Sequence, residues 1–363
     1  MRLFIILISI ELLLLSCSTV PPSEPDNFNS EINVKVLKWF NGHKAAVTIN
    51  YDAGWNIHPT YEKTVNEVMQ RNLTMDWELI TSNYMSPERY SLIENFKTNL
   101  MSHGIHFFGH GHRHINHDSL NFNEAYEDFK LCFDLMTEWG LKPSVYAYPG
   151  SLGYLARTQL ANMLAGFISA RGGRTTIDEF FICPDNKTEP DNWYYLPSAI
   201  IASENSAYIN NDAEIQYILN LTLDKTAWII LMYHSIGFVG GYHYYPMDEF
   251  VKDLDFIAAN DFWCGNMDLV VKYIKERNNF NFKETFISSN SEMSSYKVEF
   301  FDNLENEMYN QPLSIEFEMN GESFRSIKLV SPEGSEVQNE VTNGFVTFNI
   351  IPDEKEYIVH LVK

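Results

Sequence analysis

Short apolar runs alternate with amphipathic segments along residues 45–277. The apolar runs, rich in β-branched and aromatic residues, predict strands at 45–51, 73–81, 105–108, 144–148 and 228–233. Apolar residues at helical spacing predict helices at 61–71, 86–100, 120–139, 247–260 and 269–277, and residues 165–171 belong to a further strand–helix unit. This alternation is typical of a mostly parallel sheet that is closed or nearly closed into a barrel.

The pattern changes after about residue 283. Short alternating runs, separated by Asn, Gly, Ser and Pro, predict strands at 296–301, 313–319, 324–330, 345–350 and 357–362. Strands without intervening helices favour a small antiparallel β-sandwich over residues 284–363. The barrel is expected over 44–283, and the polar, proline-containing segment 18–43 is expected to be a tether.

The N-terminus has the pattern of an export signal. Met1 and Arg2 precede an apolar run over 3–15, which is too short to span a bilayer as a helix and predicts a signal peptide over 1–17. The run contains Glu11 and ends in Leu-Leu-Ser-Cys at Cys17, which resembles the bacterial lipobox. We expect an exported lipoprotein held at the cell envelope through lipidated Cys17; the alternative is an ordinary signal peptide with an incidental cysteine.

The amino-acid composition limits which classes of molecule the protein is expected to bind. The formal net charge of −22 repels phosphate backbones and argues against nucleic acid. An aromatic content of 14% suits sugars, whose C–H faces stack on rings, although most of these rings must be core. Besides Cys17 only Cys132, Cys183 and Cys264 occur, without C-x-x-C spacing, so neither a disulfide framework nor a thiolate zinc site is expected. Nothing indicates an obligate protein partner.

Six of the eleven histidines lie within residues 103–117. Such a density of imidazoles indicates a metal site, a proton-transfer site, or both, and a histidine-rich surface loop is the alternative. His110 and His114 are four residues apart, which would place both rings on one side of a helical turn. The other residues that bear chemistry also fall at predicted strand ends, namely Asp52, the Pro149-Gly150 turn and His234.

The order of these motifs resembles the polysaccharide deacetylase family, the NodB-homology domain of carbohydrate esterases, over about residues 44–279. The family's T-F-D-D-G-W motif is similar to residues 50–55, and G-H-E-I-A-S-H-G-Y-R-H aligns with residues 104–114. F-A-Y-P-Y-G is similar to residues 146–151, and an apolar strand ending in His matches residues 230–234. The closing helix is similar to residues 263–277.

The resemblance implies a deformed (β/α) barrel and metal-dependent removal of N- or O-acetyl groups from a polysaccharide. A divalent ion, zinc or else cobalt or nickel, polarises the acetyl carbonyl and a bound water. Carried over by position, His110 and His114 would be metal ligands, Asp52 the general base and His234 the general acid. Substrate or oxyanion contacts would come from Tyr148, Gly150 and Trp55.

The sequence differs from the family pattern at one metal-binding position. The family's metal-binding Asp corresponds to Ala53, which cannot ligate, and catalytic zinc normally has three protein ligands. His117 or Asp118 could complete the site, Asp52 could turn to the metal, or the protein could be a non-catalytic glycan-binding lipoprotein. The histidine tract could also merely sequester metal. Ala147 replaces the family's third-motif Arg, and Arg171 could supply that charge or form a surface salt bridge.

Overall fold

The structure is a computed structural model that describes residues 32–52, 59–183, 190–204, 208–318, 325–342 and 345–363. Within these ranges, seven parallel strands form a barrel in the order β2 to β8, and β8 pairs with β2 to close it. The strands are β2 (Ala45–Tyr51), β3 (Met75–Leu79), β4 (Ile105–Gly109), β5 (Val145–Ala147), β6 (Ser169–Arg174), β7 (Leu196–Ile200) and β8 (Trp228–Tyr233). The predicted parallel barrel is therefore confirmed.

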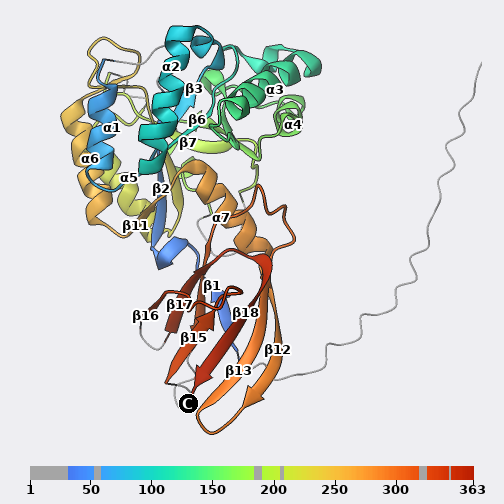
Figure 1. Ribbon diagram of the computed structural model, residues 1–363. Helices are drawn as coiled ribbons and strands as arrows, with labels where there is room; N and C mark the ends of the chain where they lie inside the picture. The colour runs from blue at the N-terminus through green and yellow to red at the C-terminus, as the bar shows by residue number, and fades with distance from the viewer. Residues whose placement is uncertain (1–31, 53–58, 184–189, 205–207, 319–324, 343–344) are drawn as a thin grey trace, which may run out of the picture. The chain divides into compact units, whose positions relative to one another are not determined.

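Helices surround the barrel strands (Figure 1). They are α1 (Tyr61–Met69), α2 (Pro87–Asn95), α3 (Phe122–Glu138), α4 (Ala156–Ala165), α5 (Asp212–Asp224), α6 (Met247–Ala259) and α7 (Met267–Asn279). Local chemistry sets several starts: Ser86 accepts from the Arg89 amide before Pro87, and Asn121 and Glu124 form a capping box at α3. Because helices cover the sheet, all residues of β2 and β8 are buried, which explains why β8 is apolar throughout and why β2 has only two polar residues, Thr48 and Asn50.

Two antiparallel four-stranded sheets form the C-terminal module. One has the order β1–β14–β17–β16 and the other β12–β13–β18–β15. Phe300 of one sheet and Phe317 of the other lie 6.3 Å apart between ring centroids, so the sheets share an aromatic core. The predicted antiparallel sheets are therefore present. Their C-terminal strands are β12 (Asn281–Ser289), β13 (Met293–Phe301), β14 (Leu313–Glu318), β15 (Ser326–Val330), β16 (Asn339–Thr342), β17 (Phe345–Ile350) and β18 (Asp353–Val362).

The sandwich also takes in part of the expected tether. Residues Val34–Val36 form β1, which pairs antiparallel with β14, Val34 opposite Phe317 and Val36 opposite Ile315. Trp39 is fully buried, and its indole N–H donates to the Thr226 carbonyl at 3.0 Å. Residues 34–43 are thus packed structure, in contrast to the tether expected to residue 43. The sandwich begins at Asn281, three residues before its expected start.

The signal peptide, Cys17 and most of the tether lie outside the described residues. Among the helices that are described, none combines the length and the apolar character needed to cross a membrane.

Candidate active site

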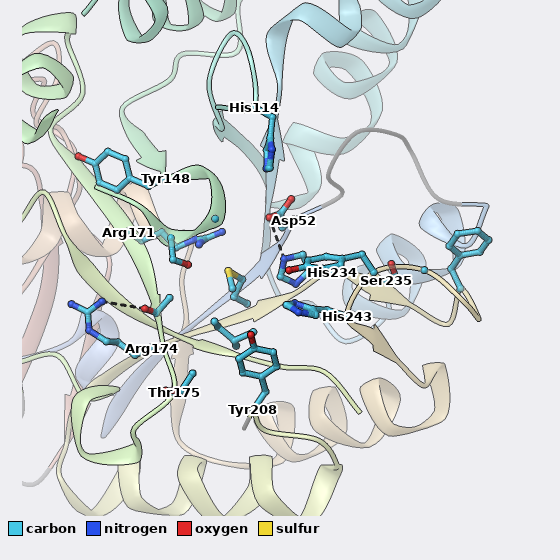
Figure 2. Close-up of a pocket in the computed structure, with 18 of the residues that line it drawn as sticks. Asp52, His114, Tyr148, Arg171, Arg174, Thr175, Tyr208, His234, Ser235 and His243 are labelled. Carbon is cyan, nitrogen blue, oxygen red and sulfur yellow. Dashed lines mark hydrogen bonds and ion pairs between the residues drawn. The ribbon is translucent and has the colours of Figure 1, made fainter. Parts of the chain in front are cut away.

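Side chains that follow the barrel strands gather at the carboxyl edge of the barrel. Asp52 follows β2, His110 follows β4 and His234 follows β8, while the Pro149–Ser151 turn lies two residues after β5. The carboxyl ends of parallel strands meet at one edge, which is where such barrels place their chemistry. A cavity of about 1170 Å³ opens there (Figure 2). Its lining includes Asp52, His114, Tyr148, Gly150, Arg171, His234 and His243.

Asp52 is the point at which two histidines converge. Its Oδ2 lies 3.5 Å from His110 Nε2 and 3.4 Å from His234 Nε2, and the residue is 7% exposed. Burial by itself raises the pKa of Asp52, but the adjacent His110 and His234 rings, with Arg171, hold it well below its usual range. Asp52 is therefore an anion near neutral pH. An ionised carboxylate beside two imidazoles can bind a cation or orient a proton-transfer group.

Hydrogen bonding fixes the tautomer of His110. Its Nδ1 lies 3.0 Å from the Ala147 carbonyl oxygen, which only accepts, so Nδ1 carries the proton. The opposite nitrogen, Nε2, is buried and has no hydrogen-bond partner within the described ranges. Burial also lowers the pKa of the ring. A neutral imidazole with a free lone pair aimed at a carboxylate is the form in which histidine binds metal.

Behind His110 lies an ion pair that the sequence analysis did not identify. Glu78 of β3 contacts Arg171 of β6, and its Oε2 lies 3.3 Å from His110 Nδ1. Both residues are 1% exposed, so Arg171 forms a buried ion pair and not the surface salt bridge considered from sequence. Burial raises the pKa of Glu78 to about 7, although Arg171 opposes the shift. Because Glu78 faces the protonated ring nitrogen, we assign it to orienting His110 and not to holding a cation with Asp52.

His114 reaches the same region without a helix. Residues 110–116 form an irregular loop, so the helical turn considered for the i, i+4 pair is absent here. The two rings nevertheless lie close, with 4.9 Å between the centroids of His110 and His114. Burial, with the adjacent His110, lowers the pKa of His114 to about 4 and keeps the ring neutral. Figure 2 shows Asp52 between His114 and His234.

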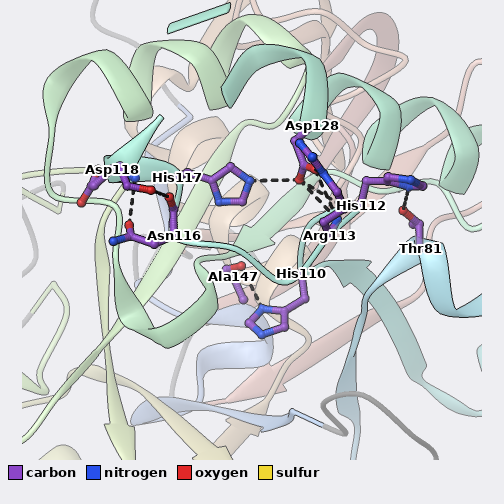
Figure 3. A network of polar contacts seen from close by, with 10 residues as sticks. Thr81, His110, His112, Arg113, Asn116, His117, Asp118, Asp128 and Ala147 are labelled. Carbon is purple, nitrogen blue, oxygen red and sulfur yellow. Dashed lines mark hydrogen bonds and ion pairs between the residues drawn. The ribbon is translucent and has the colours of Figure 1, made fainter. Parts of the chain in front are cut away.

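Asp128 of α3 holds this loop in place (Figure 3). Its carboxylate accepts from the amides of His112 and Arg113 and from the Arg113 guanidinium, and it lies 3.0 Å from His117 Nε2. His117 is fully buried and stacks on Phe129. Four contacts from one carboxylate determine the path of the backbone between the two candidate ligands.

Neither residue considered as a replacement ligand borders the cavity. His117 is committed to Asp128, and Asp118 accepts from the amides of Tyr154 and Leu155. Neither is among the described residues that line the cavity, so the structure does not bring them to His110 and His114. Ala53 and Trp55 lie outside the described residues.

The third motif supplies one wall. The Tyr148 hydroxyl is buried without a hydrogen-bond partner in the described part of the chain, and burial raises its pKa well above the usual range. Gly150 follows with φ of 61°, a left-handed conformation that favours glycine. Both border the cavity, as the predicted substrate or oxyanion roles require.

A loop after β8 adds a histidine that sequence reasoning left unassigned. The His243 ring lies edge-on to His234 with centroids 4.7 Å apart, and it stacks on Tyr242 at 3.8 Å. Burial, and then the nearby His234, lowers the pKa of His243 to about 4. Its position within the Gly-Gly-Tyr-His-Tyr-Tyr sequence was the available signal. The short strands β9 (Ser235–Ile236) and β10 (Tyr244–Tyr245) pair in parallel and place the loop beside the cavity.

No protein-family model and no curated protein sequence matches this chain. Solved structures do match. A family 4 carbohydrate esterase from Streptomyces lividans is 10% identical, covering 62% of this chain and 93% of its own, with a TM-score of 0.40. A Bacillus subtilis peptidoglycan deacetylase is 11% identical over 64% and 93%, with a TM-score of 0.41. The carbohydrate deacetylase Agd3 is 8% identical over 88% and 65%, with a TM-score of 0.49. These three structures are a carbohydrate esterase, a peptidoglycan deacetylase and a carbohydrate deacetylase.

Proposed function

We propose that this protein is a metal-dependent hydrolase that removes N- or O-acetyl groups from a polysaccharide. The observation that carries the proposal is the environment of His110 Nε2. This buried atom has a free lone pair, lies 3.5 Å from an ionised carboxylate, and neighbours a second neutral imidazole at the cavity. Neutral imidazoles and a carboxylate are a donor set that suits a catalytic divalent ion.

The residues present fit such an ion even though Ala53 cannot ligate it. His110, His114 and Asp52 would hold zinc, or else cobalt or nickel, with Asp52 supplying the anionic ligand. Bound there, the ion would polarise the acetyl carbonyl and lower the pKa of a water. Glu78 and the Ala147 carbonyl keep His110 in the tautomer that presents Nε2 to the site.

In this proposal His234 transfers a proton to the leaving group. Its Nε2 lies 3.4 Å from Asp52 Oδ2, and its Nδ1 is buried with no hydrogen-bond partner in the described part of the chain. The Asp52 carboxylate therefore orients the ring as an aspartate orients a catalytic histidine elsewhere. His234 would protonate the departing amine or alcohol, because neither leaves readily as an anion.

The cavity suits a sugar chain better than a small metabolite. Its volume of about 1170 Å³ exceeds that of most small-molecule pockets. Tyr154 and Tyr242 border it and are 58% and 71% exposed, so exposed aromatic surface is available for contact with pyranose rings. Tyr208 also lines the cavity, on the side where His243 lies (Figure 2). An acetylated polysaccharide is the substrate class that we propose.

Acetate release tests the proposal. Purified protein with added zinc or cobalt should liberate acetate from at least one of chito-oligosaccharides, peptidoglycan and acetylxylan. His234→Gln should lose about 10²- to 10⁴-fold in turnover while retaining its metal. His103→Gln, a change on the exposed side chain of the same cluster, is the matched control and should keep activity. Glycan binding without acetate release from any of the three would instead favour a non-catalytic lectin-like role.

We further propose that the protein is exported and anchored at the bacterial cell envelope through Cys17. The support is the sequence pattern alone: a basic start, a short apolar run and Leu-Leu-Ser-Cys. Palmitate labelling of the expressed protein should depend on Cys17 and disappear in Cys17→Ala. Label-free protein released to the medium would contradict the anchor and leave an ordinary signal peptide.

A further inference from the structure

A second cluster of candidate metal ligands lies at the opposite edge of the barrel. Asp76 and His106 are the second residues of β3 and β4 and face each other in the parallel register. Ser144 directly precedes β5, and Asp268 is the second residue of α7. The amino ends of three adjacent strands and the start of a helix therefore converge, at the strand ends remote from Asp52 and His234.

The spacing of the donor atoms fits a single small ion. Asp76, His106 and Asp268 each offer one ligand atom, and these atoms lie within 4.8 Å of one another. His106 Nδ1 and Asp268 Oδ1 are 3.0 Å apart. Two ligands on a tetrahedral zinc with bonds of about 2.0 Å are roughly 3.3 Å apart, so little movement is needed. The space between them is about 10 Å³, the size of one water molecule or one dehydrated cation.

Ser144 gives an independent indication of a ligand. It lines this small cavity, is 3% exposed, and its hydroxyl has no hydrogen-bond partner among the described residues. A buried hydroxyl without a partner costs free energy, so an isolated serine would be unfavourable here. The remaining walls are Phe107, Phe108 and Val145, which offer no side-chain donor or acceptor. A cation in the cavity would give the hydroxyl oxygen its partner.

The rest of the cluster is held in place by hydrogen bonds and brings two carboxyl groups close together. Asp76 accepts from the Asn266 side chain at 2.9 Å and from the Met267 amide at 2.7 Å, which fixes both of its oxygens. Two carboxylates that face one small space are stabilised by a positive charge between them. A proton on His106 can supply one such charge, and a divalent ion supplies two.

We propose that Asp76, His106 and Asp268, with the Ser144 hydroxyl, form a second site for a divalent transition-metal ion, with zinc as the probe. Imidazole and carboxylate ligands together suit zinc better than calcium or magnesium. The site is structural: its cavity is too small for a substrate and shares no lining residue with the large one. Its ion links the start of α7 to β3 and β4.

Zinc stoichiometry tests this site separately from the catalytic one. Metal-free full-length protein is loaded with zinc, desalted and assayed for bound metal. The native protein should bind two equivalents, and His110→Gln/His114→Gln should keep one. Adding Asp268→Asn to that double variant should remove the remaining zinc, whereas Asp255→Asn, an exposed carboxylate on α6, should not. Zinc should raise the Tm of the double variant by roughly 5 °C, and this shift should vanish with Asp268→Asn.

Failure of either site is recognisable. If the double variant retains no zinc, or if Asp268→Asn leaves the zinc count unchanged, the second site does not exist and His106 serves only as an ion-pair partner of Asp268. If instead zinc bound by the native protein depends on Asp268 and not on His110 and His114, the second site stands and the catalytic proposal fails. Should Asp268→Asn not fold, His106→Gln carries the same test, because it removes the nitrogen ligand without changing a carboxylate.

Discussion

At the scale of single residues, Asp52 has two roles open to it. The family resemblance implies a general base, while the geometry puts its Oδ2 within 3.5 Å of a candidate ligand nitrogen. We predict that Asp52→Asn, which keeps the shape and removes the charge, weakens zinc binding at the His110/His114 site by at least about 100-fold. Zinc titration followed by isothermal calorimetry measures this, with His234→Gln as the control that keeps metal. Native zinc affinity in Asp52→Asn together with lost acetate release would assign Asp52 as the base.

The Glu78–Arg171 pair allows a second prediction at this scale. Both side chains are buried, so removing one leaves an uncompensated charge in the interior. We expect Arg171→Met to reduce the free energy of unfolding by about 3–5 kcal/mol in urea denaturation. Glu78→Gln/Arg171→Met should cost less than the sum of the two single changes. Lys328→Met breaks the half-exposed pair with Glu336, and it should cost less than about 1 kcal/mol. Additive effects of Glu78→Gln and Arg171→Met would mean that the pair is not coupled.

At the scale of elements, the 110–116 loop depends on one glycine. Gly111 has φ of 91°, and a Cβ added there would meet the Arg113 carbonyl oxygen at 2.7 Å. Gly240 has a similar φ of 81°, but an added Cβ would meet nothing within 4 Å. Both alanine variants carry the left-handed backbone penalty of about 1–2 kcal/mol, whereas only Gly111→Ala must also displace backbone.

We therefore predict that Gly111→Ala lowers zinc affinity at the proposed catalytic site, because His114 moves relative to His110. Gly240→Ala should lose comparable stability and keep zinc affinity. Thermal unfolding and zinc titration of the two variants separate these effects. Equal zinc affinity in both variants would show that the loop path does not set the ligand geometry.

Elements with a strong local pattern are those that the sequence predicts well. Strands β2 and β8 have the predicted bounds because most of their residues are apolar, and α2 begins at Pro87, one residue after its predicted start. Strand β7 was not predicted, since Leu-Pro-Ser-Ala-Ile has a proline and weak β-formers, and β12 is largely exposed and lacks clean alternation. Both segments form strands because they pair with neighbouring strands, and this pairing cannot be seen from a short stretch of sequence.

The candidate site shows the same division. Asp52, His110 and His234 could be found because each stands where an apolar strand ends. Glu78 could not, since an acidic residue inside a strand ordinarily marks a solvent-facing position, and its partner Arg171 is 93 residues away. Whether His114 or His117 is available as a metal ligand also depends on tertiary contacts. Only the structure shows that His117 is hydrogen-bonded to Asp128.

At the scale of the whole molecule, buried carboxyl groups should shape the dependence of stability on pH. Burial raises the pKa of Asp253 and of Glu276 to about 8, and that of Glu78 to about 7. Each folded value exceeds the unfolded value near 4, so the folded state retains protons that the unfolded state has lost. This contribution is full below the unfolded pKa and is lost as pH rises through 7–8. Histidines with a lowered pKa, such as His114, change the stability only between about pH 4 and pH 6.5, which is below this range.

We therefore predict that Tm falls by roughly 5 °C between pH 6.5 and 8.5 in the presence of a chelator. The formal charge of −22 acts in the same direction, because deprotonation adds to self-repulsion. Asp253→Asn, which can still accept the hydrogen bond from Tyr233, should show a smaller fall. Scanning calorimetry at the two pH values checks this, and a Tm that rises with pH would contradict the assignment.

Strand β1 has a consequence for the order in which the molecule is made. Val36 pairs with Ile315, so ~280 residues, the whole barrel included, are synthesised between the two partners. At about 5–20 residues per second, translation supplies β14 tens of seconds after β1. During that interval β1 lacks its pairing partner, and all seven barrel strands are completed before β14 is made. A nascent chain stalled before residue 313 should thus contain a folded barrel, preceded by unpaired β1 residues that stay open to proteolysis until β14 emerges.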